Sequence, residues 1–327
     1  MWGRWPGQGD FVAEVDIVPA EGADAYRLSV DGEFLDGRRL SGSGQAVVYT
    51  GYEWRAKLTL NGREFLQVLD LSPTSPTGRL FDDDDEAFGM AVTLSPVAEA
   101  DEASDAAAAG GDASTIAVVI PLALKSGSRQ RLVIVGQGLG DGEIDLGAGV
   151  TVESIIERSE SRLIAEVSVA EDAAPGMRAV SVAGGVAEQG LAVYDSVDRL
   201  EVQPELAVAR VGAEQTPAVS GVFRALGYME GPGGESIALG DVPVTWSVAP
   251  WDETAEADGD VRYAGVMDKA AGIFEPSGAG PNPDRKYDTN NAGNLRVTAR
   301  VAGQDDQVAD DAHLIVTVQR WNNPPLR

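Results

Sequence analysis

The sequence predicts an all-β protein that consists of a small antiparallel β-barrel followed by two β-sandwiches. Short segments alternate between apolar and polar residues with period 2, turn signals separate them at close intervals, and no long stretch shows a helical period. The chain has 327 residues, of which 43% are hydrophobic. That length and composition suit two or three domains, each with its own core.

Residues 1–96 are expected to form the barrel, with about eight strands. The turn Asn61-Gly62 between two apolar segments is the strongest hairpin signal in the chain. We expect Trp54 to lie in the core and Arg55 to point outward. The segments that predict strands are Phe11–Ile17, Ala25–Val30, Ala46–Tyr49, Trp54–Leu60, Glu64–Leu69, Gly78–Phe81 and Gly89–Leu94.

Residues 97–114 are predicted to be an acidic Ala/Gly linker. They contain no aromatic and no basic residue, so too few apolar groups are available to offset the entropy cost of ordering.

Residues 115–195 predict the first sandwich. The phrase Leu132–Leu139, with Pro175-Gly176 before a later strand, resembles immunoglobulin-like domains of the IPT/TIG kind. Gly136-x-Gly138-x-Gly140 follows a strand, as in some nucleotide-binding loops. No helical pattern follows, and Asp141 and Glu143 would repel phosphate, so we interpret the glycines as a turn.

Residues 196–327 predict the second sandwich, which resembles bacterial immunoglobulin-like domains in its order of a Thr-Trp-Ser strand, Gly-x-Phe and closing strands. We expect Trp246 to be buried. Long loops are predicted at 226–243, 249–262 and 275–294.

The charge excludes one class of partner. There are 52 acidic and 25 basic side chains, for a net charge of −27, and each predicted segment is acidic. Binding of nucleic acid needs a basic surface, so we exclude it. Only four of the basic residues are lysine. A salt-rich habitat and a GC-rich genome both account for this composition, and the two stay open.

The composition also excludes several kinds of catalytic and metal site. The chain has no cysteine and one histidine, so it has no thiolate site and no site with two histidines. The longest apolar runs are too short to span a membrane, and the N-terminus lacks the apolar region of a signal peptide.

Three remaining candidates are given structural interpretations. Asp82–Glu86 lacks the ligand spacing of a calcium loop and predicts a solvated turn. His313 is not accompanied by a nucleophile motif and is interpreted as a structural or surface residue. No two carboxylates are singled out as a glycosidase pair. No catalytic, cofactor-binding or metal-binding residue is predicted.

A subunit interface is the one functional surface that the residues suggest. Aromatic residues near chain termini weakly indicate contact with a neighbour. The segment Gly280–Asn294 is rich in Asn and Gly, and it predicts either a self-bonded loop or a docking loop. The candidate interface residues are Trp2, Trp5, Asn282, Asp284, Arg285, Asn290, Asn291 and Trp321.

Several segments together resemble the alpha subunit of quinohemoprotein amine dehydrogenase, in its three β-domains and in the same order. The segments that carry the resemblance are Pro6–Phe11, Gly51–Arg55, Ala279–Pro283, Thr289–Leu295, Ala312–Leu314 and Val318–Arg320. The resemblance covers essentially the whole chain, and the stretch in the C-terminal loop is its most specific part.

The resemblance implies a periplasmic heterotrimer that oxidises primary amines. Its expected partners are a β-propeller subunit and a small subunit that carries cysteine tryptophylquinone. Haem c would be carried by a diheme cytochrome domain, which this chain lacks because it contains no Cys-x-x-Cys-His. That domain would then be a separate polypeptide, or this chain is a shortened form or an independent module. We therefore expect no cofactor in this chain and a non-catalytic scaffold role.

Two alternatives stay open. A cell-surface adhesion or carbohydrate-binding protein would account for the sandwiches but not for the matching segments in the barrel and the C-terminal loop. A ligand-binding barrel is the second, because an eight-stranded barrel is wide enough to hold one small molecule.

Overall fold

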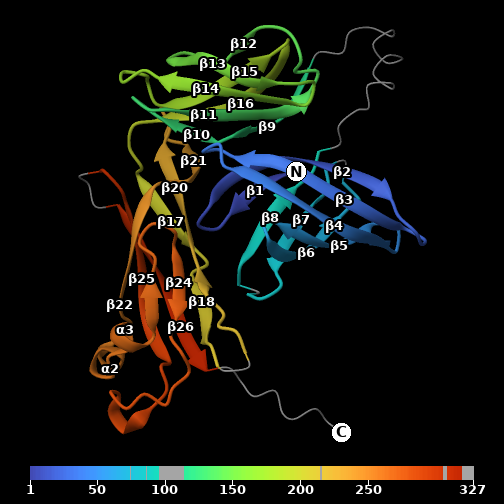
Figure 1. Ribbon diagram of the computed structural model, residues 1–327. Helices are drawn as coiled ribbons and strands as arrows, with labels where there is room; N and C mark the ends of the chain where they lie inside the picture. Colours follow the sequence, from blue (N-terminus) through green and yellow to red (C-terminus); the bar gives the residue numbers. More distant parts are fainter. Residues whose placement is uncertain (74, 86, 96–113, 214–215, 305–307, 319–327) are drawn as a thin grey trace.

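The computed structural model confirms the all-β fold, with a closed barrel at the N-terminus followed by further β-sheets (Figure 1). We call residues 1–95 the barrel, 114–195 the first sandwich and 196–318 the second sandwich. The structure describes residues 1–73, 75–85, 87–95, 114–213, 216–304 and 308–318. In this part of the chain, no helix is both long and apolar enough to cross a membrane.

Eight antiparallel strands close the barrel in sequence order. The first strand, Trp2–Trp5, pairs with both its successor and the last strand, so it completes the ring. Sequence reasoning overlooked this strand and treated its tryptophans as exposed terminal residues. The strands are β1 (Trp2–Trp5), β2 (Gly9–Pro19), β3 (Ala25–Phe34), β4 (Arg39–Tyr49), β5 (Glu53–Leu60), β6 (Arg63–Asp70), β7 (Thr77–Asp82) and β8 (Gly89–Thr93).

Side chains fill the barrel, because alternate residues of each strand point inward. Trp54 is buried and its indole donates a hydrogen bond of 2.9 Å to Gln67, whereas Arg55 is exposed, as predicted. Asn61 and Gly62 both have positive φ (47° and 82°) and join β5 to β6 in the predicted two-residue hairpin.

The first sandwich packs two four-stranded sheets face to face. The predicted strand Ile116–Leu124 is divided at Pro121, which lacks an N–H for the ladder, and its halves join different sheets. Its strands are β9 (Thr115–Ile120), β10 (Ala123–Lys125), β11 (Arg129–Gln137), β12 (Ile144–Asp145), β13 (Val150–Arg158), β14 (Arg162–Val169), β15 (Gly176–Val182) and β16 (Gly185–Tyr194).

The second sandwich contains three sheets around a core that includes Trp246. Its strands are β17 (Arg199–Gln203), β18 (Leu206–Val211), β19 (Gly221–Val222), β20 (Arg224–Glu230), β21 (Ser236–Asp241), β22 (Val244–Pro250), β23 (Gly265–Met267), β24 (Ile273–Pro276), β25 (Gly293–Val301) and β26 (Ala309–Val318).

The loops predicted in the second sandwich have mixed outcomes. The long loop predicted at 226–243 is wrong, because these residues belong mainly to the β20–β21 hairpin. The stretch 249–262 contains helix α2 (Glu253–Ala257) and most of helix α3 (Asp260–Tyr263). Irregular backbone with one 3-10 turn, η2 (Lys286–Asp288), occupies most of 275–294.

Candidate functional site

Buried apolar residues and charged pairs gather where the three domains meet. The barrel lies against the outer face of the β9–β11–β14 sheet of the first sandwich (Figure 1). Val12 of the barrel packs there with Ile120, Val133, Val135 and Ile164, so the joint has a buried apolar centre.

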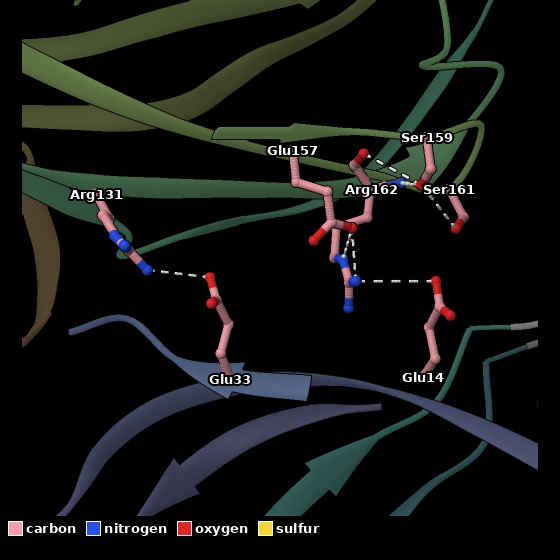
Figure 2. Close-up of polar contacts among 7 residues, drawn as sticks. All are labelled: Glu14, Glu33, Arg131, Glu157, Ser159, Ser161 and Arg162. Carbon is pink, nitrogen blue, oxygen red and sulfur yellow. Dashed lines mark hydrogen bonds and ion pairs between the residues drawn. The ribbon is translucent and has the colours of Figure 1, made fainter. Parts of the chain in front are cut away.

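Charged pairs flank this apolar centre (Figure 2). Arg131 of β11 donates a hydrogen bond of 3.2 Å to Glu33 of the barrel. Arg162 of β14 donates two hydrogen bonds to Glu157 Oε1, at 2.8 and 2.6 Å, and its Nη2 lies 4.0 Å from Glu14 of the barrel. Each guanidinium therefore bridges the two domains.

Arg162 also lines a groove of about 1200 Å³, which is lined in addition by barrel residues such as Tyr26 and Trp54. Among the described residues, its Nη1 is buried without a hydrogen-bond partner. Glu14 and Asp16 also line the groove, so its lining carries both positive and negative side chains and does not favour an ion of either sign. Side chains fill the barrel interior, and some of them, such as Ala13, Trp54 and Leu69, also line this groove, so ligand binding by the barrel stays a prediction.

A second set of charges joins the barrel to the second sandwich. Arg4 lies 3.1 Å from Asp10 and 3.3 Å from Asp241, and Asp241 pairs with Arg224 at 2.6 Å. Burial raises the pKa of Asp10, and the charge and hydrogen bond of Arg4 partly oppose that rise. The pairing of Arg4 with Asp241 links β1 to the end of β21.

The acidic turn Asp82–Glu86 contributes to the same joint, and its prediction as a solvated turn is right for the exposed Asp83 and Asp84 but wrong for Asp82 and Asp85. Asp82 is buried, pairs with Arg63 and accepts hydrogen bonds from the N–H groups of Asp84 and Asp85. Asp85 is also buried and accepts a 2.8 Å hydrogen bond from the Ser220 N–H of the second sandwich. Glu86 lies outside the described residues.

An apolar cluster crosses the joint between the two sandwiches, although most of the core of the first sandwich forms a separate cluster. Ala123, Ala192 and Tyr194 of the first sandwich belong to the same buried cluster as Leu200 and Leu239 of the second. Apolar contact, together with the ionic contacts described above, therefore joins all three domains to one another.

The single histidine has a structural role, in keeping with its interpretation as a structural or surface residue. His313 stacks on Trp251, with ring centroids 3.8 Å apart and planes 16° from parallel, and its Nε2 lies beside Asn294 Oδ1. The neighbouring Asp310 and Asp311 accept hydrogen bonds from the Val202 N–H and the Thr298 hydroxyl. In the described ranges, no three His, Asp or Glu residues form a cluster that could hold a metal ion.

The segment 278–294 is a self-bonded loop, which was one of the two structures predicted for it. Asn282 donates to Asn291 at 2.7 Å, and Asn291 donates to the Gly278 carbonyl at 2.8 Å. Asn290 accepts from the Ala292 N–H, while the backbone N–H of Asp284 donates to Asn282.

Arg285 anchors this loop to helix α3. The Arg285 and Asp260 side chains form an ion pair of 2.5 Å in which they are only 6% and 8% exposed. Arg285 also donates to the Ala292 carbonyl, and Asp260 accepts from the Asn294 N–H. The Tyr263 hydroxyl adds a bond of 3.1 Å to the Asp284 carbonyl. The loop therefore has a fixed shape.

The candidate interface residues fall into four groups. Trp5 and Arg285 are buried within this chain, Trp5 because its ring packs edge-on against Phe65 in the barrel core. Trp2 is half-buried beside the joint between the barrel and the first sandwich. Trp321 lies outside the described residues, as does the predicted linker except Ser114. The four residues on the loop surface are Asn282, Asp284, Asn290 and Asn291.

One residue that sequence reasoning missed is exposed at the tip of this loop. The Tyr287 side chain is 84% exposed, more than any other large hydrophobic residue in the described part of the chain. Its neighbours Lys286 and Asp288 are also exposed. The sequence gives no periodic pattern at this position, so nothing in it distinguished Tyr287 from a core tyrosine.

Comparison with known proteins gives a single family. The chain matches, in order, quinohemoprotein amine dehydrogenase alpha subunit domain II at residues 1–96, domain III at 113–195 and domain IV at 200–326. No curated protein matches the sequence.

Solved structures show only distant likeness. The S-layer protein SbsC, domains 5-6, is 11% identical over 63% of this chain and 100% of its own, with a TM-score of 0.24. Yersinia pseudotuberculosis adhesin InvE is 9% identical over 63% and 59%, with a TM-score of 0.21. Bacteroides ovatus SGBP-B, in complex with mixed-linkage heptasaccharide, is 12% identical over 96% and 68%, with a TM-score of 0.25. These likenesses carry no information about function.

Proposed function

Because the chain belongs to the quinohemoprotein amine dehydrogenase alpha-subunit family through domains II, III and IV, we propose that it is a non-catalytic scaffold of such a multi-subunit complex. Its role is to hold the catalytic and electron-transfer subunits in a fixed relative position. The observation that carries this proposal is the match of three consecutive alpha-subunit domains along one chain.

The residue inventory supports a role without redox chemistry. Haem c and cysteine tryptophylquinone are both attached through cysteine, and the chain contains none. Neither group fits residues 1–327, so we propose that both are held elsewhere in the complex. The carboxylates and guanidinium groups that are buried here, such as Asp82, Asp260 and Arg285, are paired with one another or with backbone groups.

The domain joints support the scaffold role directly. Relative motion between domains is the usual expectation unless the interface is large and apolar. Here the barrel contacts both sandwiches, and a buried apolar cluster crosses the joint between the sandwiches. A body joined in this way allows little relative movement between the partners that it carries.

The proposed partners are a β-propeller subunit, a small subunit with the quinone and a diheme cytochrome c module. The proposed location is the periplasm, where such a complex would oxidise primary amines. The negative charge of −27 would favour approach of a basic redox partner.

Co-purification from the native host tests this proposal. The tagged chain is isolated at low salt, and the eluate is examined by visible absorption and mass spectrometry. We expect a c-type haem band together with a propeller protein and a quinone-bearing subunit in fixed ratio. A colourless monomer would contradict the proposal and would favour an adhesion or carbohydrate-binding protein instead.

A further inference from the structure

Tyr287 has a backbone conformation that is unfavourable for its residue type. Its φ is 63° and its ψ is 27°, and Asp288 after it has a φ of 51°. This left-handed region favours glycine, because a Cβ approaches the following carbonyl oxygen. Of the six non-glycine residues with positive φ in the described ranges, Tyr287 is the only aromatic one.

The tyrosine ring gains little from the fold in return. With 84% of the side chain exposed, it buries almost no apolar surface within this chain. Lys286 Nζ lies 5.1 Å from the ring centroid, and this contact is itself solvent-exposed. A glycine at this position would suit the backbone better and would cost the domain almost no packing.

The surrounding loop holds this conformation in place. The Arg285–Asp260 ion pair precedes the tyrosine, and Asp288 donates its N–H to the Arg285 carbonyl. Across the loop, Asn282 donates its N–H to the Thr289 carbonyl at 2.9 Å. Residues in sparsely populated conformations persist where the surrounding structure determines them, and they gather at functional sites.

We propose that Tyr287 is the anchor of a preformed protein-docking site on the second sandwich, and that it inserts into an apolar pocket of a partner subunit. Tyrosine on a rigid segment is well suited to this role, because it buries a large area and loses little conformational entropy on binding. The identity of the partner as a subunit of the amine dehydrogenase complex rests on the proposed function.

Charge at this end of the molecule defines the chemistry of the partner. Helices α2 and α3 lie at the end of the second sandwich that is far from the first sandwich (Figure 1), and Tyr263 of α3 is bonded to the loop. Exposed acidic side chains occur on both α2 and the loop, and they are Asp252, Glu253, Glu256, Asp258, Asp284 and Asp288. The exposed basic residues nearby are fewer, and they are Arg262, Lys286 and Arg296, the last of which lies over the Trp251 ring.

This acidic surround disfavours a second copy of the same chain and favours a pocket rimmed by lysine and arginine side chains. The expected partner is therefore a protein with a local basic surface and an apolar pocket that fits a phenol ring.

Two substitutions separate docking from folding. Tyr287→Gly relieves the backbone conformation, so its thermal midpoint should equal or exceed that of the wild-type chain. The same change should reduce co-purification of haem- and quinone-bearing subunits by about tenfold or more, as expected for loss of an interface anchor. Tyr287→Ala should show the same loss of capture. Tyr52→Ala, which truncates a tyrosine that is 54% exposed on the barrel, should leave capture unchanged.

A crosslink identifies the partner surface. In the full chain, Tyr287→p-benzoylphenylalanine should crosslink, on illumination in the native host, to a peptide of one subunit of the complex that contains lysine or arginine.

The outcomes distinguish this inference from the proposed function. Capture of the subunits by both the wild-type chain and Tyr287→Gly would overturn the docking site alone, as would an equal loss with Tyr52→Ala. A crosslink only between two copies of this chain would also overturn it. Capture of no subunit by the wild-type chain would overturn the proposed function and the docking site together.

Discussion

At the scale of single residues, buried charges stabilise loops whose conformation could not be predicted from the sequence. Arg285 was a candidate for contact with a partner, yet its guanidinium is used inside the chain. It neutralises Asp260 and closes the loop through the Ala292 carbonyl. A buried ion pair of this kind is sensitive to removal of one partner, because the other charge then stays buried alone.

Arg285→Ala should therefore lower the free energy of unfolding of the second sandwich by about 3–5 kcal/mol. The control is Arg296→Ala, because Arg296 is 46% exposed and lies 3.7 Å from the equally exposed Asp311. That change should cost no more than about 1 kcal/mol. Denaturant unfolding followed by tryptophan fluorescence measures both, and equal costs would contradict the structural role of Arg285.

Asp10 gives a prediction in pH. Its pKa is raised in the folded protein by burial, so folding favours the protonated carboxyl. The resulting contribution to stability is present below the unfolded pKa and is lost as the pH rises through the folded pKa.

Asp10→Asn removes this titration. The stability of the variant relative to the wild-type chain should therefore increase as the pH is raised from about 4 towards neutrality. Thermal unfolding of the two proteins across that range tests the prediction. Parallel curves would show that Asp10 does not titrate differently in the folded state.

Residue environments could be predicted only where alternation within a strand determines them. Trp54 and Trp246 follow such alternation, and both are buried as predicted. Asp85 does not, because its burial depends on Ser220, 135 residues away in sequence. The exposure of Tyr287 depends on the conformation of its loop, and a loop has no periodic sequence pattern from which exposure could be predicted.

At the scale of elements, strands with local turn signals were predictable and strands defined by distant pairing were not. The Asn61-Gly62 hairpin carries its own conformational preference. Strand β1 has only four residues, which is too short for a detectable alternation. Its place is determined by pairing with β8, the last strand of the barrel in sequence. The β20–β21 hairpin was taken for a loop because glycines at its turn, such as Gly231 and Gly234, interrupt the pattern.

The hairpin turn offers a test of backbone conformation without steric interference. Gly62 has a φ of +82°, and an added Cβ would meet no atom within 4 Å. Gly62→Ala should lower the unfolding free energy of the barrel by about 1–2 kcal/mol, through the left-handed conformation alone. Gly278→Ala is the matched control, because that Cβ also meets nothing within 4 Å and its φ is not positive. An equal effect of both changes in thermal unfolding would refute this interpretation.

At the scale of the whole molecule, the proposed scaffold role requires that the three domains behave as one body. Ile164 is fully buried on the face of the first sandwich that meets the barrel. Its environment could not be predicted from the sequence, since one face of β14 packs in the core of its own sandwich and the other face packs against the barrel.

Ile164→Ala should lower the free energy of unfolding by about 2–5 kcal/mol by leaving a cavity at the joint. Calorimetry should then show the barrel unfolding at a lower temperature than the sandwiches, whereas the wild-type chain should unfold in transitions that overlap. Val186→Ala, at a side chain that is 55% exposed on the first sandwich, should change neither. Well-separated transitions in the wild-type chain would contradict the single-body description.

The role that we propose for this chain is to hold the other subunits of an amine dehydrogenase together. The most direct measurement is the native size of the haem-containing complex in host cells that lack the chain, compared with cells in which it is restored. We predict that haem and quinone subunits are still made but migrate separately, and that restoring the chain returns them to one complex with amine-dependent haem reduction. A complex of unchanged composition and activity without the chain would contradict the account.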